Sequence, residues 1–146
     1  MNKLVVIMVG LPARGKSFIS RKLQGYMSWI GYDCKIFNVG NYRRKHFNNK
    51  FNCHSFFDDK NTNAKSLRNS FSIIVLNNLI AWLKEDITNV IGIFDATNST
   101  KEKRQLLVDT CKKNNLDMLF VESICDDNSV IKQNINLKLL NNDYLM

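Results

Sequence analysis

The stretch Gly10-Leu11-Pro12-Ala13-Arg14-Gly15-Lys16-Ser17 decides the fold. An apolar run, Leu4 to Val9, precedes it and a segment with helical spacing follows it, which is the strand–loop–helix setting of a phosphate-binding loop. Glycine at both ends lets the backbone turn so that successive amide N–H groups face one anion at the positive end of the helix. A chance glycine turn before an ordinary helix is the alternative, and the full spacing with the right flanks disfavours it.

Two loop side chains and one distant carboxylate predict a metal–triphosphate site. Lys16 can bring a positive charge to the β- and γ-phosphates, and the Ser17 hydroxyl is placed to ligate Mg²⁺. The apolar segment from Val90 ends in Asp95, some eighty residues after the loop. Such an acid holds Mg²⁺ through water or takes the proton of the acceptor. The alternative, that Asp95 caps the next helix, is weakened because Ser99-Thr100-Lys101-Glu102 is itself a capping box.

The remaining pattern alternates strands and helices and predicts one α/β domain over residues 1–146. Apolar runs predict strands at 3–9, 35–39, 90–95 and 118–124. Helical spacing predicts helices at 17–31, 62–85 and 100–114 and a last one after Asp126 or Asp127. The inner stripe of the second helix is expected to be Leu67, Phe71, Ile74, Val75, Leu79 and Leu83. The fold class is a P-loop NTPase-type three-layer α/β/α fold with a mainly parallel sheet of strand order 2-3-1-4.

The segment Asn41-Tyr42-Arg43-Arg44-Lys45-His46 carries a run of basic side chains directly after the second strand. Such runs are usually solvated charged loops. Ligands of open α/β sheets bind beyond the carboxyl ends of the strands, so we expect Arg43 or Arg44 to bind an anion. Further along, Lys101, Lys103 and Arg104 lie in the first turns of a helix, where the macrodipole disfavours cations, and this hints at a compensating anion.

Composition restricts the partners without choosing among them. The 146 residues carry a formal charge of +8 and are 45% apolar, which suits one core and anionic ligands such as phosphorylated metabolites, nucleotides or nucleic acid. Four scattered cysteines, without a Cys-x-x-Cys pair, argue against zinc and disulfides and for reduced thiols in a cytoplasmic protein. No apolar run is long enough to predict a membrane span.

The order of these motifs resembles the 6-phosphofructo-2-kinase domain of the enzymes that make fructose 2,6-bisphosphate. The resemblance rests on Pro12-Ala13-Arg14 inside the loop, on Phe37-Asn38-Val39-Gly40 with Tyr42-Arg43-Arg44, on Phe94-Asp95-Ala96-Thr97-Asn98, and on the run Glu122 to Asp127. It covers nearly the whole chain. It implies transfer of the γ-phosphoryl group of ATP, with Mg²⁺, to the 2-hydroxyl of fructose 6-phosphate.

The resemblance also implies roles for individual residues. The catalytic residues would be Lys16, Asp95 and Cys125, although a buried structural thiol explains Cys125 equally well. The fructose 6-phosphate site would comprise Arg43, Arg68, Thr97 and Lys103. ATP would be held by Gly10, Leu11, Pro12, Ala13, Arg14, Gly15, Lys16, Ser17 and Phe18, with Asn134 and Lys138 as a further contact. The metal ligands would be Ser17 and Asp95.

Three departures from the family pattern stand out. Lys103 replaces an arginine for the sugar substrate, which keeps the charge but loses the forked pair of donors. The segment from Asn134 to Lys138 is one residue shorter than in the family. The chain also ends after Asp143-Tyr144, before the last kinase strand of the family, and lacks an Arg-His-Gly phosphatase motif, so we expect a C-terminally truncated kinase domain.

Two other functions stay open at this point. A catalytically incomplete ATP-binding fragment would bind the nucleotide without making product. A polynucleotide kinase-like protein would use the basic surface for nucleic acid, but the aromatic residues do not alternate with the basic ones as stacking platforms would. The sequence therefore does not favour nucleic acid, and it leaves a homodimer open.

Overall fold

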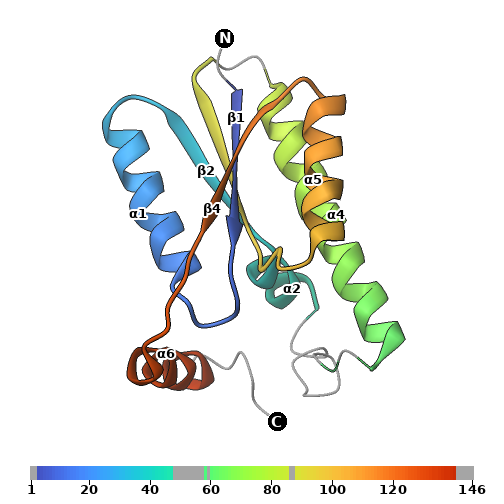
Figure 1. Ribbon diagram of the computed structural model, residues 1–146. Helices are drawn as coiled ribbons and strands as arrows, with labels where there is room; N and C mark the ends of the chain where they lie inside the picture. Colours follow the sequence, from blue (N-terminus) through green and yellow to red (C-terminus); the bar gives the residue numbers. More distant parts are fainter. Residues whose placement is uncertain (1–2, 48–57, 59, 86–87, 141–146) are drawn as a thin grey trace.

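The computed structural model describes residues 3–47, 58, 60–85 and 88–140 (Figure 1). Its centre is a sheet of four parallel strands in the order β2-β3-β1-β4, which confirms the predicted order. The strands are β1 (Lys3–Val9), β2 (Asp33–Asn38), β3 (Val90–Asp95) and β4 (Asp117–Glu122). Parallel pairing aligns the carboxyl ends of the strands, so the phosphate loop after β1 and the carboxylate that ends β3 meet at one edge of the sheet.

Helices cover both faces of the sheet and make the expected three layers (Figure 1). On one face α1 (Lys16–Trp29) packs over Val6, Met8 and Ile93 through partly buried side chains such as Leu23. On the other face the long α4 (Thr62–Lys84) and α5 (Lys101–Lys113) bury the opposite side chains of the same strands. The two central strands are apolar on both sides because both of their faces are covered.

The basic segment after β2 is a helix, not the solvated loop that its charge suggested. α2 (Val39–Phe47) begins directly where β2 ends, because the Asn38 side chain accepts a hydrogen bond of 2.8 Å from the Asn41 amide. Val39 and Tyr42 pack against Ala64 and Phe71 of α4. This small apolar contact holds the basic face of α2 over the carboxyl ends of the strands.

The expected stripe of α4 is partly wrong. Phe71, Val75, Leu79 and Leu83 are buried as predicted, but Leu67 and Ile74 are exposed. Leu76 and Ile80 face the core in their place. Apolar residues nearly encircle the middle of this helix, so the pattern alone did not fix its rotation about its own axis.

Thr100, not Ser99, caps α5. Its hydroxyl accepts a hydrogen bond from the Lys103 amide, and the helix begins one residue later than the capping box predicted. The consequence for Asp95 is unchanged, because the helix start is supplied without that carboxylate.

The last helix, α6 (Asn128–Leu140), begins after Asp127, whose carboxylate accepts hydrogen bonds from the Ser129 and Val130 amides. These bonds and one from the Ser129 hydroxyl lower the pKa of Asp127, the hydroxyl most of all. α6 lies beyond the carboxyl ends of the strands rather than on a face of the sheet (Figure 1), and its described residues include no buried one. Within the described part of the chain, no helix combines the length and apolarity that crossing a bilayer requires.

Candidate active site

A cleft of about 1750 Å³ opens at the carboxyl ends of the strands. It is lined by the phosphate loop, by the end of β2 and the start of α2, by the first half of α4, and by parts of α5 and α6. Known ligand sites of a single small molecule reach about 1,000 Å³. The cleft therefore has room for a nucleotide beside a second substrate.

The phosphate loop has the backbone geometry that an anion site needs. Gly15 caps α1 with a left-handed backbone (φ 84°), and no side chain caps this helix among the described hydrogen bonds. Ala13 is also left-handed (φ 61°), an uncommon conformation for a residue with a side chain. The amides at the start of α1 therefore face the cleft at the positive end of the helix dipole.

Neighbouring segments hold the loop in place. The Gly10 amide donates to the Thr97 carbonyl at 3.0 Å, and the Ser123 amide after β4 donates to Val9 at 2.8 Å. The buried Ser123 hydroxyl donates to the carbonyl of Arg14. A Cβ atom at Gly10 would lie 2.7 Å from the Ser123 carbonyl oxygen, so only glycine fits where the two segments touch.

Two asparagines complete this support. The Asn98 side chain is buried and donates to the Met8 carbonyl at 2.8 Å. Asn134 reaches from α6 and donates to the Ala13 carbonyl at 3.0 Å. The structure thus places Asn134 against the loop, and Lys138, one turn further along α6, lines the same cleft.

Lys16 is buried at the bottom of the loop, with 8% of its surface exposed. Its ammonium group donates to the Leu11 carbonyl at 2.6 Å. The pKa of Lys16 is lowered to about 8, chiefly by burial and also by the nearby charges of Lys138 and Arg14, while Asp95 acts in the opposite direction. A cation held in a site that disfavours its charge gains more than an exposed one when an anion binds beside it.

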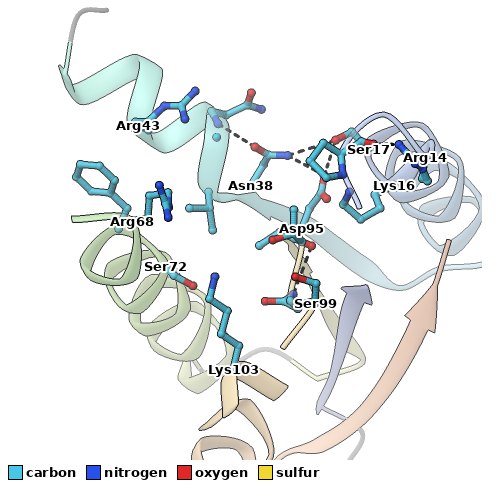
Figure 2. A pocket seen from close by; sticks show the side chains of 18 of the residues that line it. Arg14, Lys16, Ser17, Asn38, Arg43, Arg68, Ser72, Asp95, Ser99 and Lys103 are labelled. Carbon is cyan, nitrogen blue, oxygen red and sulfur yellow. Dashed lines mark hydrogen bonds between the residues drawn. The ribbon is translucent and has the colours of Figure 1, made fainter. Parts of the chain in front are cut away.

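Asp95 is the centre of the site. It is 3% exposed. Its Oδ2 accepts a hydrogen bond of 2.8 Å from the Ser17 hydroxyl and one of 2.7 Å from the side-chain amide of Asn38. Figure 2 shows these three side chains converging from α1, β2 and β3. The Ser17 and Asp95 oxygens are hard donors of the kind that Mg²⁺ prefers, so the residues present fit this metal.

Cationic side chains from three helices form a second wall of the cleft. Arg43 comes from α2, Arg68 from α4 and Lys103 from α5, and all three lie across the cleft from Lys16 and Ser17 in Figure 2. Arg43 is 9% exposed, while Arg68 and Lys103 are partly buried. We refer to these three residues as the acceptor wall. Thr97 lines the cleft between the loop and this wall.

The other predicted residues lie at the margins of the cleft. Residues 12–18 line it, whereas Gly10 and Leu11 contribute through their backbone bonds. Phe18 is 58% exposed at its edge. Cys125 lines the cleft as a free, partly buried thiol. The buried thiols of Cys34 and Cys111, whose pKa values burial raises, lie in the hydrophobic cores instead. Cys53 is outside the described residues.

Sequence reasoning missed three residues that shape the site, namely Asn38, Asn98 and Ser123. Each was quoted inside a motif but was given no role. The signal for Asn38 was its place at the end of a strand, as for Asp95; the structure adds that the two residues are in register. Ser123 has no comparable signal, because its partner lies 109 residues earlier in the chain.

The site joins an anion-binding loop, a lysine, a hydroxyl–carboxylate pair and a wall of cations. A sequence profile of the family described as 6-phosphofructo-2-kinase matches residues 1–146. The chain belongs to the 6-phosphofructo-2-kinase family.

Curated relatives agree with this assignment. A probable 6-phosphofructo-2-kinase of Schizosaccharomyces pombe is 50% identical over 144 residues, which are 98% of this chain and 21% of the relative. The 6-phosphofructo-2-kinase 1 of Saccharomyces cerevisiae is 42% identical over 148 residues, 98% of this chain and 18% of its own length. The human 6-phosphofructo-2-kinase/fructose-2,6-bisphosphatase 3 is 40% identical over 141 residues, 96% of this chain and 27% of its own length. The chain thus spans about a fifth to a quarter of these 6-phosphofructo-2-kinases.

Solved structures support the fold. A Mycobacterium tuberculosis APS kinase in complex with AMPPNP and APS superposes with a TM-score of 0.68 at 16% identity, covering 96% of this chain and 72% of the APS kinase. At this identity the likeness shows the fold alone: the members of the 6-phosphofructo-2-kinase family and APS kinase share the P-loop kinase architecture.

Proposed function

We propose that this chain transfers the γ-phosphoryl group of ATP to the 2-hydroxyl of fructose 6-phosphate, giving fructose 2,6-bisphosphate and ADP. The observation that carries the proposal is the contact of the Ser17 hydroxyl with the Asp95 carboxylate at 2.8 Å, directly beside the phosphate loop. It brings a hydroxyl of the nucleotide loop and the carboxylate that ends β3 to one point.

The loop and Lys16 would hold the triphosphate of ATP. The amides of residues 13 to 17 surround the β- and γ-phosphates, and the ammonium group of Lys16 exchanges its bond to the Leu11 carbonyl for phosphate oxygens. Ser17 and Asp95 would hold Mg²⁺, which when bound neutralises charge on the phosphate oxygens. Asn134 and Lys138 on α6 would contact the nucleotide from the other side of the loop.

The acceptor wall would bind fructose 6-phosphate. Arg43 and Arg68 can each present two parallel N–H groups to the 6-phosphate, while Lys103 offers a point charge. Thr97, between the wall and the loop, would bond a sugar hydroxyl. Cys125 would contact the reacting groups from the end of β4.

The transfer step then needs few reacting groups. The 2-hydroxyl oxygen forms a bond to the γ-phosphorus while the bond from this phosphorus to the β–γ bridging oxygen breaks. The hydroxyl proton passes to the Asp95 carboxylate, and ADP leaves with the bonding electron pair. Positioning and charge stabilisation supply most of the rate, which suits a site rich in cations and backbone amides.

A product assay tests the proposal. The 146-residue chain is incubated with Mg-ATP and fructose 6-phosphate, and the acid-labile 2-phosphate ester and ADP are measured. We expect equal amounts of the two products. ATP binding by calorimetry without any ester would overturn the proposal and favour an ATP-binding fragment, and saturable, salt-sensitive oligonucleotide binding would favour a polynucleotide kinase instead.

Lys16→Met is the matched control for this assay. Methionine keeps the length of the side chain and removes a charge that burial disfavours, so the fold and the melting temperature should be kept. Loss of one group that stabilises transition-state charge costs about 10²- to 10³-fold in kcat. Unchanged turnover in the folded variant would contradict the role given to Lys16.

A further inference from the structure

Asn38 connects the carboxylate that ends β3 with the start of α2, on two sides of the cleft. Its Nδ2 donates to Asp95 Oδ2 at 2.7 Å and lies 3.4 Å from the Ser17 hydroxyl, while its Oδ1 accepts from the Asn41 amide at 2.8 Å. The Nδ2 end of the Asn38 side chain therefore contacts the Asp95 carboxylate, and its Oδ1 end caps α2. Figure 2 shows this bridge between the acceptor wall and the phosphate loop.

The surroundings leave the Asn38 amide little freedom. Its backbone is in register with Asp95 in the parallel pair β2–β3, which fixes the distance between the two side chains. A Cβ atom at Gly40 would lie 3.2 Å from Asn38 Oδ1, so glycine at this position makes room for the cap. The cap also fixes which end of the amide points to Asp95, because an amide has one acceptor and one donor end.

Both hydrogen bonds from Asn38 and Ser17 fall on the same carboxylate oxygen, Oδ2. Two donors on one oxygen fix the rotation of the Asp95 carboxylate, and with it the direction in which Oδ1 points. α2, whose start is fixed by the same amide, carries Arg43 of the acceptor wall. The orientation of the carboxylate and the start of the helix that carries the arginine thus share one side chain.

We propose that Asn38 is a positioning residue for phosphoryl transfer: it orients Asp95 with Oδ2 toward Ser17 and Oδ1 toward the acceptor, and it aligns α2 to this carboxylate. The inference rests on the proposed function. It goes beyond a simple helix cap, because a cap alone would not require the donor end of the amide.

Three variants separate the two ends of the amide. Asn38→Asp keeps an N-cap oxygen but removes the donor and places a second carboxylate beside Asp95. Asn38→Ala removes both ends. Asn61→Ala is the matched control, because Asn61 caps α4 through the same contact, from the Ala64 amide to its Oδ1 at 3.1 Å, and is not among the described residues that line the cleft.

We expect kcat to fall about 10- to 100-fold in both Asn38 variants, as for other residues that orient a ligand-bearing side chain. All three variants should melt at lower temperature, because Asn38→Ala and Asn61→Ala lose a cap and Asn38→Asp brings a second carboxylate against the buried Asp95. Asn61→Ala should keep kcat at saturating fructose 6-phosphate within about twofold, because α4 carries Arg68 of the acceptor wall, which affects the KM, but no reacting group. An Asn38→Asp variant with wild-type kcat, or an Asn61→Ala variant with the same loss of kcat, would overturn the proposal.

A binding measurement keeps this test separate from the proposed function. The affinity for ATP is measured by calorimetry with and without Mg²⁺ in the wild type and in Asn38→Ala. We expect the gain from Mg²⁺ to fall about tenfold in the variant while the metal-free affinity is kept. A wild type that binds Mg-ATP but makes no ester would refute the proposed function alone, and an unchanged gain from Mg²⁺ would refute the role of Asn38 alone.

Discussion

The phosphate loop and the acceptor wall are built in different ways. The loop is one continuous stretch of eight residues, and it is held by hydrogen bonds from Gly10 to Thr97, from Ser123 to Arg14 and from Asn134 to Ala13. The acceptor wall has no continuous stretch: Arg43, Arg68 and Lys103 come from three helices. The helices α2 and α4 meet through a small apolar contact at Phe71.

This contrast assigns the two halves of the cleft to different substrates. A loop fixed by backbone bonds suits the triphosphate, whose charge and shape are the same in every turnover. A wall of side-chain donors from three helices suits the single phosphate of a sugar, which it can contact from several directions. We therefore expect changes in the loop to leave the acceptor KM unchanged and changes in the wall to leave the ATP affinity unchanged.

The largest effect is expected from Arg68→Ala. A hydrogen bond to a charged group contributes about 1.5–3 kcal/mol, so the KM for fructose 6-phosphate should rise about 10- to 100-fold while the ATP affinity stays within twofold. Steady-state kinetics and calorimetry measure the two quantities. Lys84→Ala, at the exposed end of the same helix, is the control. An equal rise of the KM in this variant would contradict the assignment of the acceptor to the wall.

The pH dependence of ATP binding tests the loop half. Lys16 has a pKa of about 8, against an ordinary value of 10.5, chiefly because it is buried. Bound phosphate favours the charged form, so above pH 8 the protein must take up a proton to bind ATP. The affinity should be constant below about pH 7 and should fall by up to about tenfold per pH unit above 8.

Calorimetry in buffers of different ionisation enthalpy measures this proton uptake directly. Lys16→Met is the control, since it has no ammonium group to titrate. A wild-type affinity as flat between pH 8 and 9 as that of the control would show that Lys16 is not the group that meets the phosphate.

Ser123→Ala should have a smaller effect, confined to the nucleotide. The variant removes the hydroxyl that donates to the Arg14 carbonyl and so loosens the loop. Loss of such a bond costs about 1 kcal/mol, which is roughly a fivefold weaker ATP affinity, with the acceptor KM unchanged. Ser70→Ala removes an exposed hydroxyl bonded to Ser66 within α4 and should leave both values unchanged. A change of the acceptor KM in Ser123→Ala would contradict the assignment of the loop to ATP and of the acceptor wall to fructose 6-phosphate.

The smallest expected effect is a gain, from Lys103→Arg. The family resemblance implies arginine at this position, and a guanidinium group can make two parallel hydrogen bonds to a phosphate where an ammonium group acts as a point charge. We expect the KM for fructose 6-phosphate to fall about two- to fivefold. Lys101→Arg, on the exposed side of the same helix turn, should change nothing. A higher KM in Lys103→Arg would show that the wall has adapted to lysine.

Local patterns predicted the loop half of the site well. The spacing from Gly10 to Ser17, the apolar runs of β1 and β3, and the carboxylate that ends β3 are all short-range signals, and the strand order that brings them together is confirmed. The α2 helix was missed, because its basic side chains and Gly40 are typical of a loop. Its formation depends on the cap by Asn38 and on contact with Phe71, and neither is visible in a local pattern.

By itself the sequence determined the phosphate loop, the parallel α/β fold and the family, because each depends on residues that are adjacent in the chain or repeat with a regular period. Only the tertiary structure decided which side chains meet: Asn38 and Ser17 on one oxygen of Asp95, and Ser123 on a loop that lies 109 residues away. The physical reason is that hydrogen bonds between segments depend on the register of neighbouring strands and on where helices pack, and no local pattern encodes those distances.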